Sequence, residues 1–236
     1  MDGFCSIRIK GNLIVELDDK LMAIELDHLF ICSQVNAPEM EHLLDFGLVE
    51  GRSNIHPGQG TANRCIFFDN FMLELLFVRE EKEISSPIIA PTNLRERCHY
   101  HQTGYSPFGI AFRCIEQDAN LPFQTWTYKP PYLPPQLQID IVRDTKPHEP
   151  LIFVIPFEKR KHTRPIDHPV GIRRVTGMQI EIPSNKTFSE SVKTIDSRDI
   201  VNFQAGTANL VIIECDRGKQ KKARDFRPYL PLIFRF

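Results

Sequence analysis

The stretch 24–78 carries the most regular hydrophobic pattern in the chain and constrains the fold most strongly. Residues 24–32 (IELDHLFIC) place apolar side chains on one face with a period of two, which is typical of a β-strand. Residues 40–44 then carry apolar side chains at helical spacing, and a glycine-rich turn (HPGQG) leads to two further apolar segments, 64–69 and 71–78. A strand, a helix and then two or three strands predict a βαβββ unit.

The same order of elements recurs later in the chain. The tetrapeptide GTAN occurs at 60–63 and again at 206–209, each time just before an apolar strand-like segment. A strand pattern at 175–182 and a polar, helix-compatible segment at 185–195 precede the second copy, and a fainter copy begins at 109–115. We therefore expect an α+β fold made of two or three βαβββ units.

This periodicity suggests three segments. Residues 1–21 are expected to be an N-terminal extension, because Met22 stands just before the first well-patterned strand. Residues 22–158 would hold two paired βαβββ units. Residues 159–236 would form a further βαβββ unit with a C-terminal strand, packed on the same domain.

Charge and cysteine usage narrow the function classes. The 29 Lys and Arg residues against 30 Asp and Glu residues give a net charge of -1, so no overall positive field favours nucleic acid. Apolar runs are strand-length, which predicts no membrane span. The six cysteines form no close pair in the sequence, which in a chain without an export signal predicts reduced thiols and a cytoplasmic protein.

Glu74 is the most informative single residue. It interrupts an otherwise apolar strand, FMLELLFV, whose neighbouring side chains predict burial on both faces. A buried carboxylate without a partner costs several kcal/mol, so a cation, an arginine, a metal or a proton must satisfy it. His28 occupies an inward position on the first strand, and a His with a Glu on two inward-facing strands is half of a divalent-metal site.

Structural explanations compete with each of these functional readings. Glu74 could pair with Arg64 on the adjacent strand, and His28 could be a hydrogen-bonded core residue. His56 and Arg64 flank the glycine-rich turn and could orient an anionic ligand. Alternatively, the glycines are present only because the turn requires positive φ angles, and the flanking charges are solvated. Trp126 could form the wall of a pocket for an apolar ligand or pack against prolines.

The residues 26–31 (LDHLFI), the helix after them, HPGQGTANR and LELLFV together resemble the first unit of the vicinal oxygen chelate superfamily. More narrowly, they resemble its glyoxalase-like branch, as do the stretches 103–113 and 168–183. The resemblance implies paired βαβββ units whose curved, mixed sheets surround a cup. It also implies a divalent metal ion that chelates two vicinal oxygens of a substrate, with His28 and Glu74 at the first-strand and fourth-strand ligand positions.

The later segments depart from the family pattern. At the corresponding positions they offer Ile110 and Phe153, or Met178 and Pro231, none of which can bind a metal through its side chain. A loop histidine, His168 or His101, would complete the metal site, and His168 is the one carried forward. The candidate residues are thus His28, Glu74 and His168 for the metal, and His56, Arg64 and Trp126 for the substrate.

Two functions follow from the resemblance. The first is a metal-assisted lyase, isomerase or dioxygenase acting on a small oxygenated organic molecule. The alternative is a metal-free small-molecule binding or resistance protein that uses the same cup. A homodimer is also expected, because a partner subunit often completes such cups in this superfamily.

Overall fold

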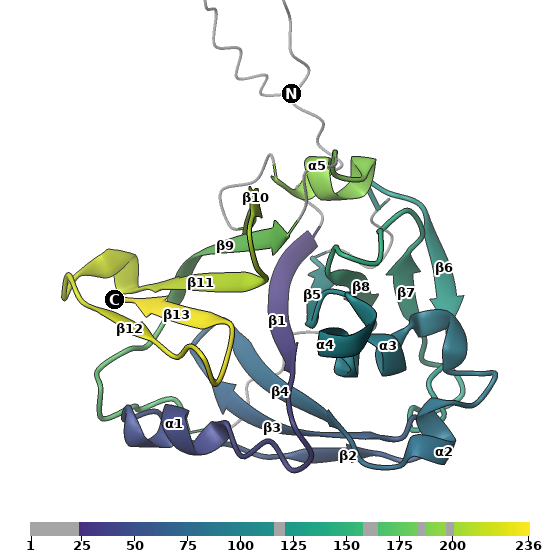
Figure 1. The fold of residues 1–236 in the computed structure, drawn as a ribbon, viewed down its shortest axis with the longest axis horizontal. Coiled ribbons are helices and arrows are strands. Elements are labelled where there is room, and N and C mark those ends of the chain that lie inside the picture. The colour runs from purple at the N-terminus through teal and green to yellow at the C-terminus, as the bar shows by residue number, and fades with distance from the viewer. Residues whose placement is uncertain (1–23, 116–120, 158–164, 184–186, 197–200) are drawn as a thin grey trace, which may run out of the picture.

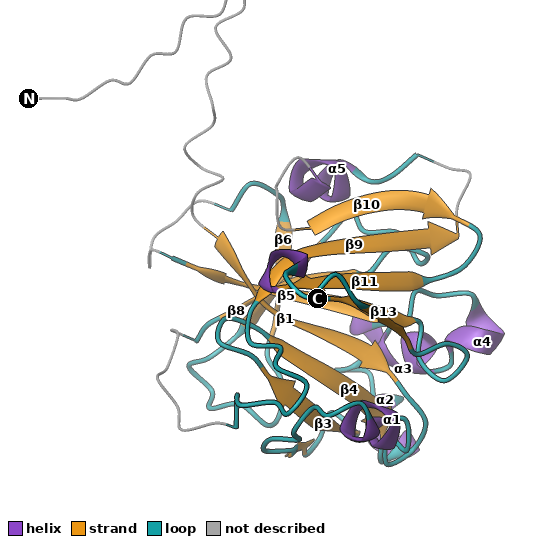
Figure 2. Ribbon diagram, turned by 90° about the vertical axis from the view of Figure 1, so that its left-hand side faces the viewer, coloured by secondary structure: helices purple, strands orange, loops and turns teal. Residues whose placement is uncertain are grey.

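The computed structural model describes residues 24–115, 121–157, 165–183, 187–196 and 201–236. The expected extension at the N-terminus lies outside these residues. Two mixed β-sheets, one of eight strands and one of five, form the framework of the described chain (Figures 1 and 2). The predicted α+β class with mixed sheets is confirmed.

The first unit has the predicted βαβββ order. Its elements are β1 (Ile24–Cys32), α1 (Met40–Asp45), β2 (Asn54–His56), β3 (Thr61–Phe67) and β4 (Met72–Val78). β1 runs parallel to β4, and β3 lies antiparallel between β4 and β2. The first and last strands of the unit are therefore direct neighbours, and side chains from both can meet.

A second group of four strands repeats this arrangement. Its strands are β5 (Phe108–Cys114), β6 (Thr125–Tyr128), β7 (Ile139–Val142) and β8 (Leu151–Ile155). β5 is parallel to β8, and β7 lies antiparallel between β8 and β6. The two groups join through antiparallel β1 and β5, so the order across the sheet is β2-β3-β4-β1-β5-β8-β7-β6.

Short helices between the two groups cover one face of this sheet. They are α2 (Glu81–Ile84), the 3₁₀ helix η2 (Ala90–Thr92), α3 (Leu94–Cys98) and α4 (Tyr100–Thr103). Ile84, Ile89 and Leu94 pack in one buried cluster with side chains of β1, β4 and β8, among them Phe30 and Phe153. We call this side of the sheet the helix-covered face.

The five-stranded sheet lies against the first unit (Figure 2). Its elements are β9 (Val175–Pro183), α5 (Glu190–Asp196), β10 (Val201–Gly206), β11 (Leu210–Cys215), the 3₁₀ helix η3 (Asp216–Gly218), β12 (Ala223–Asp225) and β13 (Leu232–Arg235). The strand order is β10-β9-β11-β13-β12, with β9 between β10 and β11. This order differs from that of the first unit, in which the first strand, β1, lies beside the last, β4.

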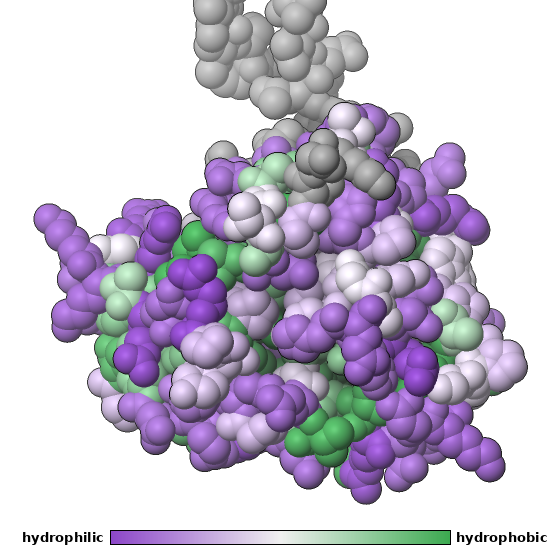
Figure 3. All heavy atoms as spheres, viewed as in Figure 1, coloured by the Kyte–Doolittle hydropathy of each residue, from purple (hydrophilic) through white to green (hydrophobic). Residues whose placement is uncertain are grey.

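The main core joins the two sheets. Leu29 of β1 and Leu73 and Leu75 of β4 belong to one buried cluster with α1 and with Met178 and Phe234 of the second sheet. Both faces of β4 are thus buried, as its sequence predicted, because the other face carries the short helices. The surface in Figure 3 is mainly hydrophilic, with hydrophobic side chains in separate patches. None of the helices in the described part of the chain is long and apolar enough to cross a membrane.

The glycine-rich turn is held tightly against α2, and this yields a stability prediction. Gly60 has φ +77°, and a Cβ there would lie 2.5 Å from both the Glu80 carbonyl oxygen and the Ile84 nitrogen. Gly104 has a similar φ of +73° with no heavy atom within 4 Å of a Cβ. We expect Gly104→Ala to lower the free energy of unfolding by about 1 kcal/mol, the backbone cost alone. Gly60→Ala has the same backbone cost and in addition a steric overlap of its Cβ with the backbone of Glu80 and Ile84. It should lower the free energy of unfolding by about 3 kcal/mol or more.

Urea denaturation of the two variants and the wild type measures this difference. Equal losses for Gly60→Ala and Gly104→Ala would show that the turn is not packed against α2 in this way.

Candidate functional site

Buried polar side chains gather on the helix-covered face, beside β1, β3 and β4. The alternation along each strand directs Thr61 and Asn63 of β3 to the same face as Glu74 of β4 and His28 of β1. All four, together with Gln59 in the turn before β3, are at most 9% exposed. Since burying polar groups is costly, such a concentration marks a candidate site.

His28 and Glu74 face each other at the centre of this group. The Nε2 atom of His28 lies 3.7 Å from the Oε2 atom of Glu74. On its other side, His28 Nδ1 lies 2.6 Å from an oxygen of Asp27, which also pairs with Arg113 of β5. A register shift between Leu26 and His28 interrupts the regular β1–β5 pairing at this point. A carboxylate only accepts, so Nδ1 carries the proton and Nε2 of a neutral His28 faces Glu74.

Glu74 is held by an asparagine, not by an arginine. Asn63 Nδ2 donates a 2.8 Å hydrogen bond to Glu74 Oε1, while Asn63 Oδ1 accepts from the Asn54 backbone. Arg64 points to the opposite face, because it is one residue further along β3. There it bonds to the carboxylates of Glu50 and Glu41. The alternative pairing of Glu74 with Arg64 is wrong, and Arg64 is not available at the helix-covered face as a substrate contact.

A second polar chain extends the group toward β6. His56 Nδ1 and Gln59 Nε2 both lie 2.9 Å from the Thr61 hydroxyl, and Tyr128 donates its hydroxyl to Gln59 Oε1 at 2.9 Å. The ring of Tyr132 lies 4.6 Å from that of His56. The expected residue His56 therefore lies within the same buried polar group as Thr61.

Burial controls the protonation of both histidines. It lowers the pKa of His28, which the Glu74 carboxylate partly offsets, and it also lowers the pKa of His56. Neutral His28 therefore presents a lone pair to a carboxylate oxygen at a distance too long for a direct hydrogen bond. A proton donor or a cation between these atoms would satisfy both, so the pair can exchange a proton or bind a positive charge.

The metal suggested by the resemblance fits this pair only in part. Two atoms bound to one zinc-like ion would lie about 3–3.5 Å apart, close to the observed 3.7 Å. The carboxylate on His28 Nδ1 is a common outer partner of a metal-binding histidine. However, the described residues hold no group of three or more His, Cys, Asp or Glu side chains suited to a metal. Opposite His28, the second unit supplies Ala111 and then Phe153, whose ring centroid lies 5.6 Å from that of His28.

His168 lies elsewhere and serves a different purpose. Its Nδ1 accepts a hydrogen bond from the Val49 backbone N–H at 3.0 Å, so its Nε2 donates to the Phe67 carbonyl at 2.9 Å. Its ring packs against Phe68, which belongs to the core on the opposite side of the sheet. Neither nitrogen is free to bind a metal, and His168 does not complete the His28–Glu74 pair.

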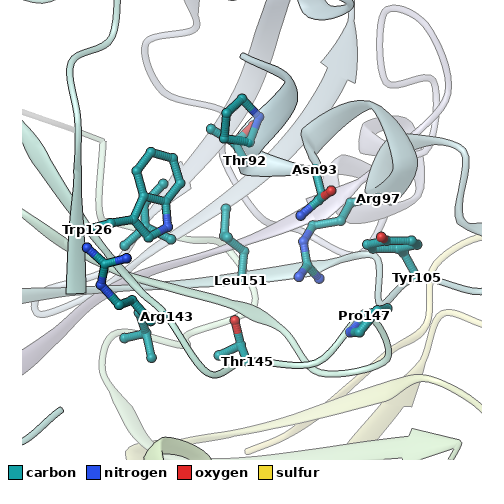
Figure 4. A pocket seen from close by; sticks show the side chains of 12 residues that line it. Thr92, Asn93, Arg97, Tyr105, Trp126, Arg143, Thr145, Pro147 and Leu151 are labelled. Atoms are coloured by element: carbon teal, nitrogen blue, oxygen red, sulfur yellow. The ribbon is translucent and has the colours of Figure 1, made fainter. Parts of the chain in front are cut away.

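Sequence reasoning missed Gln59, Thr61 and Asn63. The alternation of side chains along β3 could have identified two of them, because Thr61 and Asn63 point to one face of the strand. Arg64, the residue predicted to contact the substrate, points to the opposite face. The remaining expected substrate residue, Trp126, lies on the helix-covered face and lines a separate pocket with Arg97 and Arg143 (Figure 4).

Comparison with known proteins finds likeness only at the level of structure. No family model matches the sequence, and no curated protein matches it. A hypothetical protein from Staphylococcus aureus superimposes with a TM-score of 0.54 at 11% identity, covering 90% of this chain and 98% of that one. This likeness concerns the fold alone.

Two further solved structures give looser superpositions. Methylmalonyl-CoA epimerase from Mycobacterium tuberculosis has a TM-score of 0.34 at 15% identity over 55% of this chain and 85% of that one. A xylose isomerase-like TIM barrel/4-hydroxyphenylpyruvate dioxygenase fusion protein has a TM-score of 0.41 at 12% identity, over 82% and 37% of the two chains.

The role of His168 predicts a pH-dependent loss of stability. His168→Ala leaves the partly buried Val49 N–H and the carbonyl of buried Phe67 unpaired and should lower the free energy of unfolding by about 2 kcal/mol at pH 7.5. Burial lowers the pKa of His168 in the folded protein, so its unfolded form takes up a proton first. The stability that depends on His168 is therefore full above about pH 6.5 and declines as the pH falls below it.

Urea denaturation at pH 7.5 and pH 5.5 checks this expectation. The wild type should lose more stability between the two values than His168→Ala does. An unchanged unfolding free energy in the variant would contradict the two backbone hydrogen bonds.

Proposed function

We propose that the helix-covered face binds a small oxygenated organic molecule beside His28 and Glu74, in a fold of the vicinal oxygen chelate kind. The observation that carries the proposal is the 3.7 Å approach of these two side chains within a buried polar group that borders an apolar cluster. It agrees with the ligand positions that the sequence resemblance implies, on the first and fourth strands of the unit. The two groups of four strands joined through β1 and β5 support the same assignment.

The surrounding side chains would prepare the pair for proton transfer. Asp27 fixes the tautomer of His28, so that Nε2 is the basic atom. Asn63 occupies one oxygen of Glu74 and leaves the other directed at His28. With both side chains nearly inaccessible to solvent, a C–H or O–H group of a bound molecule would lose its proton to Nε2 or to Oε2 without competition from water. Lyases and isomerases perform chemistry of this class.

A divalent cation, where bound, would be held by His28 and Glu74 together with oxygens of the ligand. It would supply Lewis-acid stabilisation of an enolate or oxyanion. The metal-free alternative, a binding or resistance protein, is favoured by a specific observation: the second unit presents Ala111 and Phe153 where further metal ligands would be needed.

Metal and small-molecule binding to matched variants test the proposal. Mn²⁺ binding is followed by the loss of the free-ion EPR signal in wild type, His28→Gln, Glu74→Gln and the exposed control Glu190→Gln. Binding of oxalate and of catechol, two compounds with vicinal oxygens, is measured by calorimetry with and without EDTA. We expect Glu190→Gln to behave like the wild type and the two site variants to bind at least about tenfold more weakly.

The outcomes separate the two functions. Mn²⁺ binding that needs both His28 and Glu74 supports the metal-assisted enzyme. Oxalate or catechol binding in EDTA that is lost in Glu74→Gln supports the metal-free protein. If neither Mn²⁺ nor either compound binds the folded wild type in a way that depends on these residues, the proposed function is wrong.

The same variants carry a stability prediction. Glu74→Gln removes a buried charge but keeps an oxygen for Asn63, so the free energy of unfolding should change by less than about 1 kcal/mol. Asn63→Ala leaves the Glu74 carboxylate without its donor and should cost about 2 kcal/mol or more. Urea denaturation compares the two. A larger loss in Glu74→Gln than in Asn63→Ala would contradict the described hydrogen bonding.

A further inference from the structure

A pocket of about 110 Å³ opens between the short helices and strands β6–β8. Figure 4 shows Arg97 and Tyr105 on one side of it and Trp126 and Arg143 on the other. The volume corresponds to only a few water molecules, at about 30 Å³ each. It suits a small chemical group better than a whole drug-sized ligand.

Arg97, from α3, is the unusual member of this lining. Arg97 is only 2% exposed. Its Nη1 donates hydrogen bonds to the backbone carbonyl oxygens of Ser106 and Glu149 at 3.1 and 2.7 Å. Its Nε is buried without a hydrogen-bond partner. None of the carboxylates in the described chain forms an ion pair with it. Burial lowers the pKa of Arg97 to about 10, so the group still carries its charge at neutral pH.

The carboxylate of Glu149, whose backbone carbonyl accepts from Arg97, is already engaged. The side chain of Glu149 accepts hydrogen bonds from the backbone N–H groups of Lys146 and Ser189, both at 2.7 Å. Glu149 therefore holds the loop before α5 in place, and it acts on Arg97 only over a longer distance. A buried cation that lines a cavity and has no carboxylate partner among the described residues leaves room for an external anion.

The rest of the lining has the same character. Arg143 is exposed and uses its Nε on the Thr125 carbonyl, with no carboxylate paired to it among the described residues. Asn93 and Thr145 add polar groups, and the described lining contains no Asp or Glu. Tyr105, whose ring centroid lies 5.7 Å from the Arg97 guanidinium, and Trp126 provide aromatic walls.

We propose that this pocket binds the oxyanion group of a small molecule, a carboxylate or a phosphoryl group, with Arg97 at its base and Arg143 at its mouth. The charge of the Arg97 guanidinium would attract such a group, and the exposed guanidinium of Arg143 would donate charge-assisted hydrogen bonds to it. The site does not depend on the His28–Glu74 pair, because none of its lining residues belongs to that polar group. The anion site can therefore be present or absent independently of the function proposed above.

Trp126 makes the pocket directly observable, since it is the single tryptophan of the chain. We expect inorganic phosphate, propionate or both to change its fluorescence saturably, at constant ionic strength maintained with sodium chloride. Arg143→Gln, at an exposed position, should fold normally and weaken binding by about tenfold, as expected for loss of a charge-assisted hydrogen bond. Arg97→Gln should abolish binding. Arg52→Gln removes an exposed arginine that does not line the pocket and should bind like the wild type.

Two results would overturn the proposal. One is wild-type fluorescence that responds to neither phosphate nor propionate beyond the response to chloride. The other is binding that Arg143→Gln and Arg52→Gln weaken equally, since this would indicate a general effect of surface charge. If Arg97→Gln does not fold, the comparison of Arg143→Gln with Arg52→Gln decides the question.

Discussion

A buried carboxylate in an apolar strand is the constraint on which the rest of this structure depends. Glu74 needs a donor and a facing group that tolerates its charge, and Asn63 and His28 supply them. His28 in turn needs a partner for its Nδ1 proton, which Asp27 provides, and Asp27 pairs with Arg113. The requirement of one side chain thus organises polar groups on four neighbouring strands, β3, β4, β1 and β5.

The arrangement of the two four-stranded groups explains why this happens at the centre of the sheet. Their first strands pair with each other, so residues on β1 are flanked by β4 of their own unit and by β5 of the other. The two groups share a topology but differ in chemistry, since Ala111 and Phe153 take the places opposite His28. Beside His28, the first unit therefore presents polar side chains, whereas the second unit presents the apolar Ala111 and Phe153.

Local sequence patterns predicted the parts of this account that depend on strand periodicity. The strand patterns of β1 and of the apolar run around Glu74 were enough to predict that His28 and Glu74 are buried. The register shift after Leu26 was not predicted, and it places Leu26 in the main core, away from Phe30. The prediction that Arg64 contacts Glu74 or the substrate was based on its charge and was wrong for Glu74. Alternation along β3 directs the neighbouring Asn63, not Arg64, toward the site. His168 lies in a loop, where no period indicates direction, and its partners are backbone groups that no sequence pattern marks. The sequence pattern indicates strands in the second sheet but not their order, because pairing between distant strands leaves no local periodicity.

The central claim is that His28 and Glu74 interact across the helix-covered face, and the pKa of His28 in wild type and in Glu74→Gln tests it most directly. Two-dimensional NMR of the imidazole nitrogens during a pH titration gives both values, with His168 as an internal control. The pKa of His28 should lie below its ordinary value of about 6.5 and fall further in Glu74→Gln, because the carboxylate that raises it is gone. An unchanged or higher pKa of His28 in the variant would contradict the account.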